Sequence, residues 1–363
     1  MIRSRLNKLV KGWLNNRFGR GEAQIATPVR GSTNHVIVID GTMSTLDPGD
    51  ETNAGLLAKL LGEMGSEVSL YYEPGLQWSH WHKTGDVIFG RGINSQIQRA
   101  YGYLASRYRP GDKIFLFGYS RGAYAVRSLA GVIDRVGLLR ADAATERNIR
   151  DVYRYYQSAP DSDGARIFNR NNCHAEIEIE LIGAWDTVKS LGLNMPYFWR
   201  WSAPRHAFHN HHLSKSVKRG FHALAMDETR VAYAPVMWEA TEDWKGHLEQ
   251  VWFRGTHGDI GGHLTGFSKG RPLANIPLVW MLERAESCGL PLSEGWAAQF
   301  PQDATVPSVG TFRGLGRWFI TRKARIVGRD PSEQLHISIS DCPPRPNWAK
   351  RFLARRGRGA DAL

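Results

Sequence analysis

Residues 113–133 read KIFLFGYSRGAYAVRSLAGVI, and this stretch decides the fold. A short apolar run, Lys113–Phe117, leads directly into the pentapeptide GYSRG at 118–122, and small and apolar residues follow at helical spacing. A strand, a sharp turn and a helix in this order form a nucleophile elbow, which lifts a serine hydroxyl to the top of a sheet. The two glycines remove Cβ atoms that would collide in the turn. We therefore predict that Ser120 is the nucleophile of a hydrolase.

A second pentapeptide of the same type, GFSKG at 266–270, lacks that context. The polar stretch His263–Thr265 precedes it in place of a strand, and Arg271 and Pro272 follow it. Because proline biases the residue before it away from the helical conformation, we expect no helix directly after this copy. Ser268 is therefore predicted to be a loop serine.

Strand-like and helix-like segments alternate along the chain. Such alternation is typical of a mainly parallel sheet with helices on both faces, so the expected fold class is α/β, of the α/β-hydrolase kind. The sequence predicts strands at 35–40, 67–72, 113–117, 178–183, 232–238 and 250–254, and helices at 53–63, 92–107, after the elbow, and at 145–157, 213–226 and 274–288.

The composition is that of a folded protein: 363 residues, 42% hydrophobic and 23% charged. The three cysteines, Cys173, Cys288 and Cys342, are odd in number and widely spaced, so they predict neither a disulfide framework nor a zinc site and favour a reducing compartment. No apolar run is long enough to span a bilayer, and the N-terminus lacks the pattern of a secretory signal. These features predict a cytoplasmic protein.

The net charge of +12 is concentrated at the two ends. Residues 1–30 hold seven Arg or Lys against one acid, and residues 311–363 hold twelve against four, which leaves residues 31–310 at −2. We therefore predict a basic N-terminal arm (1–30), a catalytic domain (31–310) and a basic C-terminal extension (311–363) with a disordered tail. Basic ends favour anionic surfaces such as phospholipid headgroups or nucleic acid.

Apolar residues recur at spacings of three and four within residues 1–20, and basic residues fill the other positions. With Trp13 on the apolar face, this pattern predicts an interfacial helix that places the protein at the periphery of an anionic membrane. The same helix could instead pack against the domain and expose its charges. Nucleic acid is not favoured, because no interleaved aromatic and basic strand pattern is present. Nothing in the sequence indicates an oligomeric state.

A serine nucleophile needs a base that accepts its proton and an acid that holds the base. In this fold the acid and then the base follow the serine, each just after a later strand. Asp186 follows one predicted strand and His257 follows another, so Ser120, Asp186 and His257 form the predicted triad. Asp186 could instead be a helix N-cap. Asp259 is the rival acid, although it could instead pin its loop through backbone hydrogen bonds.

An oxyanion hole requires two backbone N–H groups aimed at the developing negative charge. One is expected from Arg121, the residue after the nucleophile. The other is expected from Gly41 or Thr42, which follow the first predicted strand.

Two sequence features bear on whether the chain has a metal site. Asp40 could begin a cation site, because Asp-rich loops bind cations. The histidine cluster His206, His209, His211 and His212 matches no structural zinc spacing. Aromatic residues lie beside this cluster in the sequence, at 197–201, and they fit an apolar lid over a pocket better than a metal site. We therefore expect neither a metal nor another cofactor.

Seven segments together resemble a known family. They are VIDGT at 38–42, Asn53 at the start of the first helix, AYGYL at 100–104, GDKIFLFGYSRGAY at 111–124, GAWDTV at 183–188, ALAMDETR at 223–230 and WFRGTHGDIGG at 252–262. Over about residues 33–290 the chain resembles the α/β-hydrolase-like family that includes the catalytic domain of type VI secretion phospholipase effectors. The resemblance implies a lipid or carboxylic ester hydrolase with Ser120 as nucleophile and His257 as base. It also implies Asp186 as the acid, while Asp227 and Asp259 match family positions too.

The chain also departs from that family. Large secreted effectors carry a long membrane-anchoring or partner-binding region beyond the catalytic part, and this chain has almost none. Other members occur without a known secretion role.

Three function classes follow from the residues. The leading hypothesis is a serine esterase that cleaves acyl esters of lipids, phospholipids or small molecules through an acyl-enzyme on Ser120. The alternatives are a metal-dependent phosphoesterase built on Asp40, Asp259 and histidines, and a non-catalytic module that binds membranes through its basic ends.

Overall fold

The computed structural model describes residues 31–75, 91–188, 213, 215–239, 244–312 and 321–340. The chain divides at Ser32 into a short N-terminal unit and a compact unit that begins at Thr33. The predicted N-terminal helix, the histidine cluster, the aromatic lid and the C-terminal tail all lie outside the described residues.

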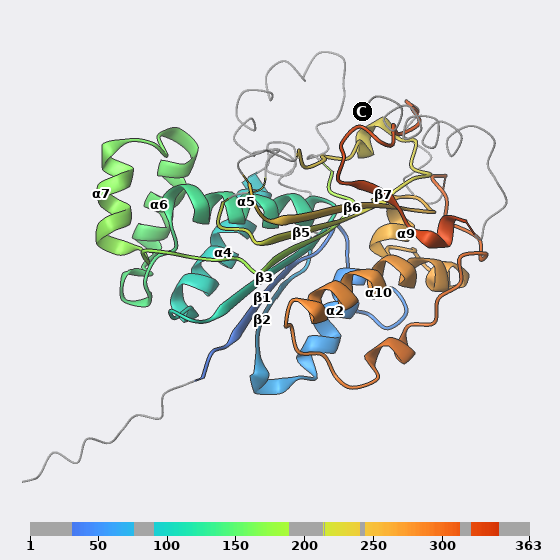
Figure 1. The fold of residues 1–363 in the computed structure, drawn as a ribbon, viewed down its shortest axis with the longest axis horizontal. Coiled ribbons are helices and arrows are strands. Elements are labelled where there is room, and N and C mark those ends of the chain that lie inside the picture. Colours follow the sequence, from blue (N-terminus) through green and yellow to red (C-terminus); the bar gives the residue numbers. More distant parts are fainter. Residues whose placement is uncertain are drawn as a thin grey trace, which may run out of the picture. The chain divides into compact units, whose positions relative to one another are not determined.

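Within the described ranges, seven strands, all paired in parallel, form one sheet in the order β2-β1-β3-β4-β5-β6-β7 (Figure 1). The strands are β1 (Asn34–Ile39), β2 (Val68–Glu73), β3 (Lys113–Tyr119), β4 (Leu181–Trp185), β5 (Arg219–Ala225), β6 (His247–Phe253) and β7 (Glu333–Leu335). The α-helices are α2 (Asn53–Gly62), α4 (Arg91–Arg107), α5 (Arg121–Val136), α6 (Glu146–Ser158), α7 (Asp163–Asn172), α9 (His257–Gly261) and α10 (Arg271–Ser287). The predicted α/β fold class is confirmed.

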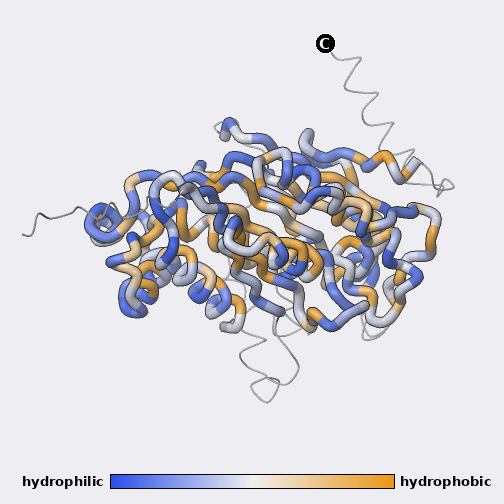
Figure 2. Tube along the Cα trace, turned by 90° about the horizontal axis from the view of Figure 1, so that it is seen from below, coloured by the Kyte–Doolittle hydropathy of each residue, from blue (hydrophilic) through white to orange (hydrophobic). Residues whose placement is uncertain are grey.

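Side chains of the strands alternate between two cores, because successive residues of a strand point to opposite faces. Val36 and Val38 of β1 belong to the core shared with α2 and α10, whereas Ile37 and Ile39 belong to the core shared with α4 and α5. Figure 1 shows these two helix pairs on opposite sides of the sheet. Figure 2 shows the apolar stretches gathered in the interior. A strand buried on both faces therefore appears in the sequence as an unbroken apolar run.

The elbow packs against the end of β1 more tightly than a side chain permits. Ser120 has φ +57° and ψ −118° between β3 and α5. A Cβ atom on Gly122 would lie 2.0 Å from the carbonyl oxygen of Ile39, and one on Gly118 would lie 2.5 Å from the backbone of Gly122. Glycine is thus required at both positions by close backbone approach.

Two predicted elements are wrong. The predicted helix at 213–226 is instead strand β5, which lies between β4 and β6. A short apolar run buried on both faces cannot be told from a buried helix by its periodicity. The predicted strand at 232–238 overlaps the short 3-10 helix Val231–Tyr233, and Pro235 beyond it forms only an isolated bridge with Val188.

The segment after the second pentapeptide also differs from the expectation. A 3-10 turn, Ser268–Gly270, runs directly into α10, which begins at Arg271. Pro272 lies in the first helical turn, where no intrahelical N–H donor is needed, so it starts the helix rather than preventing it. Ser268 itself is exposed, outside any elbow.

Part of the predicted C-terminal extension is built into the sheet. Strand β7 pairs in parallel with β6 through Gln250–Glu333, Val251–Gln334 and Trp252–Leu335. Neither β7 nor α7 was expected from the sequence. A three-residue strand has no periodicity to detect, and its position depends on the neighbouring strand.

Replacing Gly122 with alanine should destabilise the fold by about 3 kcal/mol or more, because the new methyl group must displace the backbone of β1. The matched control is Gly62→Ala at the end of α2, where an added Cβ meets no atom within 4 Å. The control should change stability by less than about 1 kcal/mol. Urea denaturation followed by circular dichroism measures both, and equal stability of the two variants would contradict the tight elbow.

Candidate active site

Strand ends bring the three predicted triad residues to one edge of the sheet. Ser120 follows β3, Asp186 follows β4, and His257 opens α9 shortly after β6. The register pairs Tyr119 with Trp185, so β3 and β4 end side by side. The carboxyl ends of parallel strands share one edge, which is where open α/β sheets bind their ligands.

The three side chains form a hydrogen-bonded chain. Ser120 Oγ lies 2.9 Å from His257 Nε2, and His257 Nδ1 lies 2.6 Å from Asp186 Oδ2. All three residues are buried. A hydroxyl, an imidazole and a carboxylate that are linked in this order can activate a serine hydroxyl.

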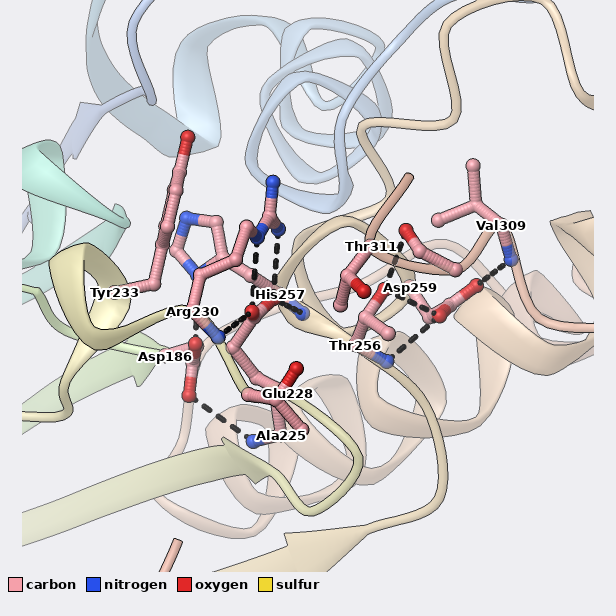
Figure 3. A network of polar contacts seen from close by, with 12 residues as sticks. Asp186, Ala225, Glu228, Arg230, Tyr233, Thr256, His257, Asp259, Val309 and Thr311 are labelled. Atoms are coloured by element: carbon pink, nitrogen blue, oxygen red, sulfur yellow. Dashed lines mark hydrogen bonds and ion pairs between the residues drawn. The ribbon is translucent and has the colours of Figure 1, made fainter. Parts of the chain in front are cut away.

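Asp186 is held in a strained turn with its carboxylate fully enclosed. Its φ is +42°, in the left-handed region, and its N–H donates to the Ala223 carbonyl at 2.8 Å. Its Oδ1 accepts the N–H of Ala225 at 3.0 Å (Figure 3). Burial by itself raises the pKa of Asp186, but the charge of Arg325 and the hydrogen bond with His257 hold it well below its usual range. The carboxylate is therefore ionised.

Histidine 222 fixes the residue after this turn. His222 Nε2 accepts the N–H of Thr187 at 3.0 Å, and its ring is completely buried on β5. Burial lowers the pKa of His222 to about 3, so the ring is a neutral acceptor. The sequence analysis missed this role, although a histidine within an apolar run is a visible signal of an internal hydrogen bond.

Arg325 is a second site residue that the sequence analysis missed. Its Nη1 lies 2.5 Å from Asp186 Oδ1 and its Nη2 lies 2.9 Å from Asp186 Oδ2. The same two nitrogens donate to the carbonyl oxygens of Ala225 and Tyr233 at 2.8 and 2.6 Å. Arg325 lies among many basic residues of the predicted extension, so no motif distinguishes it in the sequence.

Two tyrosine rings lie close to the imidazole of His257. The ring centroid of Tyr119 is 4.9 Å away and that of Tyr233 is 4.7 Å away. The Tyr119 hydroxyl donates to the His257 carbonyl oxygen at 3.1 Å. Burial lowers the pKa of His257 below its ordinary value, against the opposing effect of Asp186. The ring is therefore neutral near pH 7 and able to accept a proton.

A buried ion pair supports the backbone of His257 (Figure 3). Glu228 Oε2 accepts the His257 N–H at 3.2 Å. The Glu228 carboxylate is paired with Arg230, through Nε at 2.8 Å and Nη2 at 2.6 Å. The Arg230 guanidinium lies 4.0 Å from the centroid of the Tyr233 ring. These residues connect the loop after β5 to the start of α9.

The rival acids serve the loop rather than the imidazole. Asp259 caps α9: its carboxylate accepts the N–H of Thr256 at 2.7 Å, the hydroxyl of Ser308 at 2.5 Å and the N–H of Val309 at 2.8 Å. Asp227 Oδ2 accepts the N–H of Gly255 at 2.9 Å. Asp186 is the carboxylate that contacts the His257 ring.

Of the expected oxyanion donors, Gly41 is the one whose surroundings are defined. Gly41 lies against the Tyr119 ring, and its N–H donates to Asp40 Oδ1 at 2.6 Å. This N–H is therefore occupied, and the backbone donors that remain from the expected set are those of Thr42 and Arg121.

Asp40 is an internal anchor of the same loop. Its Oδ2 accepts the hydroxyls of Thr52 and Tyr72 at 2.6 and 2.9 Å. Burial raises its pKa to about 6, against these hydrogen bonds. Among the residues that the structure describes, no three His, Cys, Asp or Glu side chains are grouped as metal ligands. Within the same ranges, no helix has the length and apolar character needed to cross a bilayer.

The parallel sheet, the strained serine elbow and the enclosed histidine define an α/β-hydrolase-like protein. More specifically, the chain belongs to the family described as "T6SS, Phospholipase effector Tle1-like, catalytic domain", whose model matches residues 33–284. This match confirms the resemblance found in the sequence. Arg325 lies beyond the matched residues.

The individual proteins that the chain resembles share only part of its sequence. The uncharacterized protein YEL023C of Saccharomyces cerevisiae is 31% identical in an alignment of 191 residues, and the match covers 44% of this chain and 27% of the yeast protein. The chain thus spans about a quarter of that relative. The Tle1 effector, solved bound to the VgrG spike of the type 6 secretion system, is 17% identical with a TM-score of 0.35, over 65% of this chain and 52% of that one. An uncharacterized protein from Pseudomonas aeruginosa is 15% identical with a TM-score of 0.39, over 75% and 49%.

Replacing Asp259 with asparagine should destabilise the protein by about 1–3 kcal/mol, because an amide NH₂ would then face an N–H or O–H donor of the loop. Urea denaturation measures the loss. The control is Asp303→Asn, since Asp303 is exposed and binds residues of its own turn, Thr305 and Val306. A stability loss at Asp303 as large as that at Asp259 would contradict the capping role.

Proposed function

We propose that this protein is a serine hydrolase that cleaves carboxylic esters of lipids, with phospholipids as the leading substrate class. The observation that carries the proposal is the hydrogen-bonded chain from Ser120 Oγ to His257 Nε2 and from His257 Nδ1 to Asp186. Membership of a phospholipase effector family supports a lipid ester as substrate.

In the first half of the reaction, His257 Nε2 takes the proton of Ser120 as its Oγ attacks the ester carbonyl carbon. The negative charge that develops on the carbonyl oxygen is stabilised by the N–H groups of Arg121 and Thr42. The imidazolium then gives its proton to the leaving alcohol, the C–O ester bond breaks, and an acyl-enzyme remains on Ser120.

In the second half, a water molecule gives a proton to His257 Nε2 and attacks the acyl carbon. The tetrahedral intermediate collapses, Ser120 Oγ leaves and recovers the proton, and the fatty acid is released. Asp186 stays ionised throughout: it holds the Nδ1–H tautomer of His257 and stabilises the imidazolium.

The proposed access to lipid rests on charge. We propose that the basic arm, residues 1–30, brings a cytoplasmic protein to an anionic membrane surface, because the arm contains seven Arg or Lys residues and only one acidic residue. The metal-dependent alternative has less support, since the oxygens of Asp40 and Asp259 are occupied by protein donors.

Replacing Ser120 with alanine should lower ester hydrolysis by about 10⁶-fold, because it removes the hydroxyl that contacts His257 Nε2. The matched control is Ser268→Ala, the exposed serine of the second pentapeptide, which should keep full activity. Hydrolysis of p-nitrophenyl esters and of phospholipid vesicles measures both variants. A fluorophosphonate probe should label Ser120 only, and labelling of Ser120→Ala at the wild-type level would refute the assignment.

Replacing Asp186 with asparagine should lower kcat by about 10⁴-fold, because the amide would favour the wrong tautomer of His257. Asp259→Asn is the comparison, and its activity per folded molecule should fall far less. Steady-state kinetics on a short soluble ester, corrected for the folded fraction, distinguishes them. A larger loss at Asp259 than at Asp186 would transfer the role of acid to Asp259.

A further inference from the structure

We propose that Arg325 is a positioning residue of the triad, which fixes the Asp186 carboxylate against His257 and sets the pH range in which His257 acts as a base. Residues 321–335, beyond the segment that matches the family model, are then a working part of the active site. The inference rests on the proposed hydrolase function.

The first observation is the fork between Arg325 and Asp186. The two guanidinium nitrogens bind one carboxylate oxygen each, and both also donate to backbone carbonyl oxygens. The Arg325 side chain is only 5% exposed and that of Asp186 is fully buried. With the Ala225 N–H and the His257 ring, the carboxylate takes part in four hydrogen bonds. A carboxylate held in this way cannot rotate away from the imidazole.

The second observation is how the chain brings Arg325 to this place. Just before it, the chain runs antiparallel to the loop after β5: the Val231 N–H donates to the Thr321 carbonyl at 3.1 Å, and the Lys323 N–H donates to the Thr229 carbonyl at 2.7 Å. This is the loop that also carries the Glu228–Arg230 pair. The segment that carries Arg325 is therefore hydrogen-bonded to the same loop that supports His257.

The chain is anchored again just after Arg325. The buried Glu333 carboxylate accepts the backbone N–H groups of Gly328, Arg329 and Asp330 at 2.7–2.9 Å, and the indole N–H of Trp252 at 2.8 Å. Glu333 also begins β7, which pairs with β6. Arg325 thus lies between two anchored segments: the pairing with the loop after β5 on one side and strand β7 on the other. These contacts with the sheet determine its position.

The charge of Arg325 has a consequence for catalysis. The ionisable groups around His257 come from five elements: Tyr119 of β3, Asp186 after β4, Glu228 and Tyr233 after β5, His263 after α9, and Arg325. Asp186 and Glu228 favour the imidazolium, whereas burial and Arg325 disfavour it. Removing Arg325 should therefore raise the pKa of His257. Because the base must be neutral, the rising limb of activity with pH should move to higher pH.

The experiment compares Arg325→Met, Arg325→Lys and the control Arg329→Met, an exposed arginine of the same segment. It measures kcat and KM from pH 4.5 to 9 on a short soluble ester. For Arg325→Met we expect a kcat about 10–100-fold lower, a nearly unchanged KM, and a rising limb about one pH unit higher. Arg325→Lys keeps the charge but not the fork, so the limb should stay near its wild-type position while kcat remains reduced. Arg329→Met should match the wild type.

If Arg325 served stability alone, the folded fraction of Arg325→Met would have a normal kcat, and the rising limb of its pH–activity profile would not move. That result would overturn the proposal. If Arg325→Met does not fold, Arg325→Lys decides, since wild-type kcat in that variant would equally overturn it. Titration of His257 by NMR provides a readout independent of turnover. If the wild-type protein hydrolyses no ester, the proposed function fails, whereas an unchanged His257 titration in Arg325→Met refutes the role of Arg325.

Discussion

The buried charge of Asp186 is the constraint on which the rest of the site depends. An ionised carboxylate removed from water is very costly unless other groups replace its hydration. Here the replacement comes from the backbone N–H of Ala225, the imidazole of His257 and the guanidinium of Arg325. Each is delivered by a different part of the chain. The carboxylate can therefore remain charged, and His257 keeps one tautomer, only when the sheet is fully assembled.

The elbow imposes the complementary requirement on the other side of the imidazole. Ser120 reaches His257 because Gly122 lets α5 start directly against the end of β1. The ring of Tyr119, the residue before the nucleophile, packs on Gly41 and on His257 together. Ser120, His257 and the loop at Gly41 therefore meet at one close-packed contact around Tyr119, so a small change of volume at this point should disturb all three.

The sequence analysis predicted the parallel sheet and the sharp turn at Ser120 well, because both depend on local signals. The run at 113–117 and the two glycines of the pentapeptide are such signals. It mistook β5 for a helix, because a strand buried on both faces has no alternation to read. It also left Asp186 and Asp259 as rival acids, since both follow strands. Only the hydrogen bonds of the folded chain direct one carboxylate to His257 and the other to the cap of α9.

By itself, then, the sequence determined the fold class, the strained turn at Ser120 and the positions of Ser120, Asp186 and His257 just after strands, because backbone sterics and apolar patterning act over a few residues. The tertiary structure alone decided which groups bind the buried charged side chains. Arg325 is 139 residues from Asp186 along the chain, and Arg271, which binds backbone carbonyl oxygens of Glu51 and Gly262, is 220 residues from Glu51. Such pairs form because burial leaves a charge no other hydrogen-bonding partner, and burial is a property of the folded molecule.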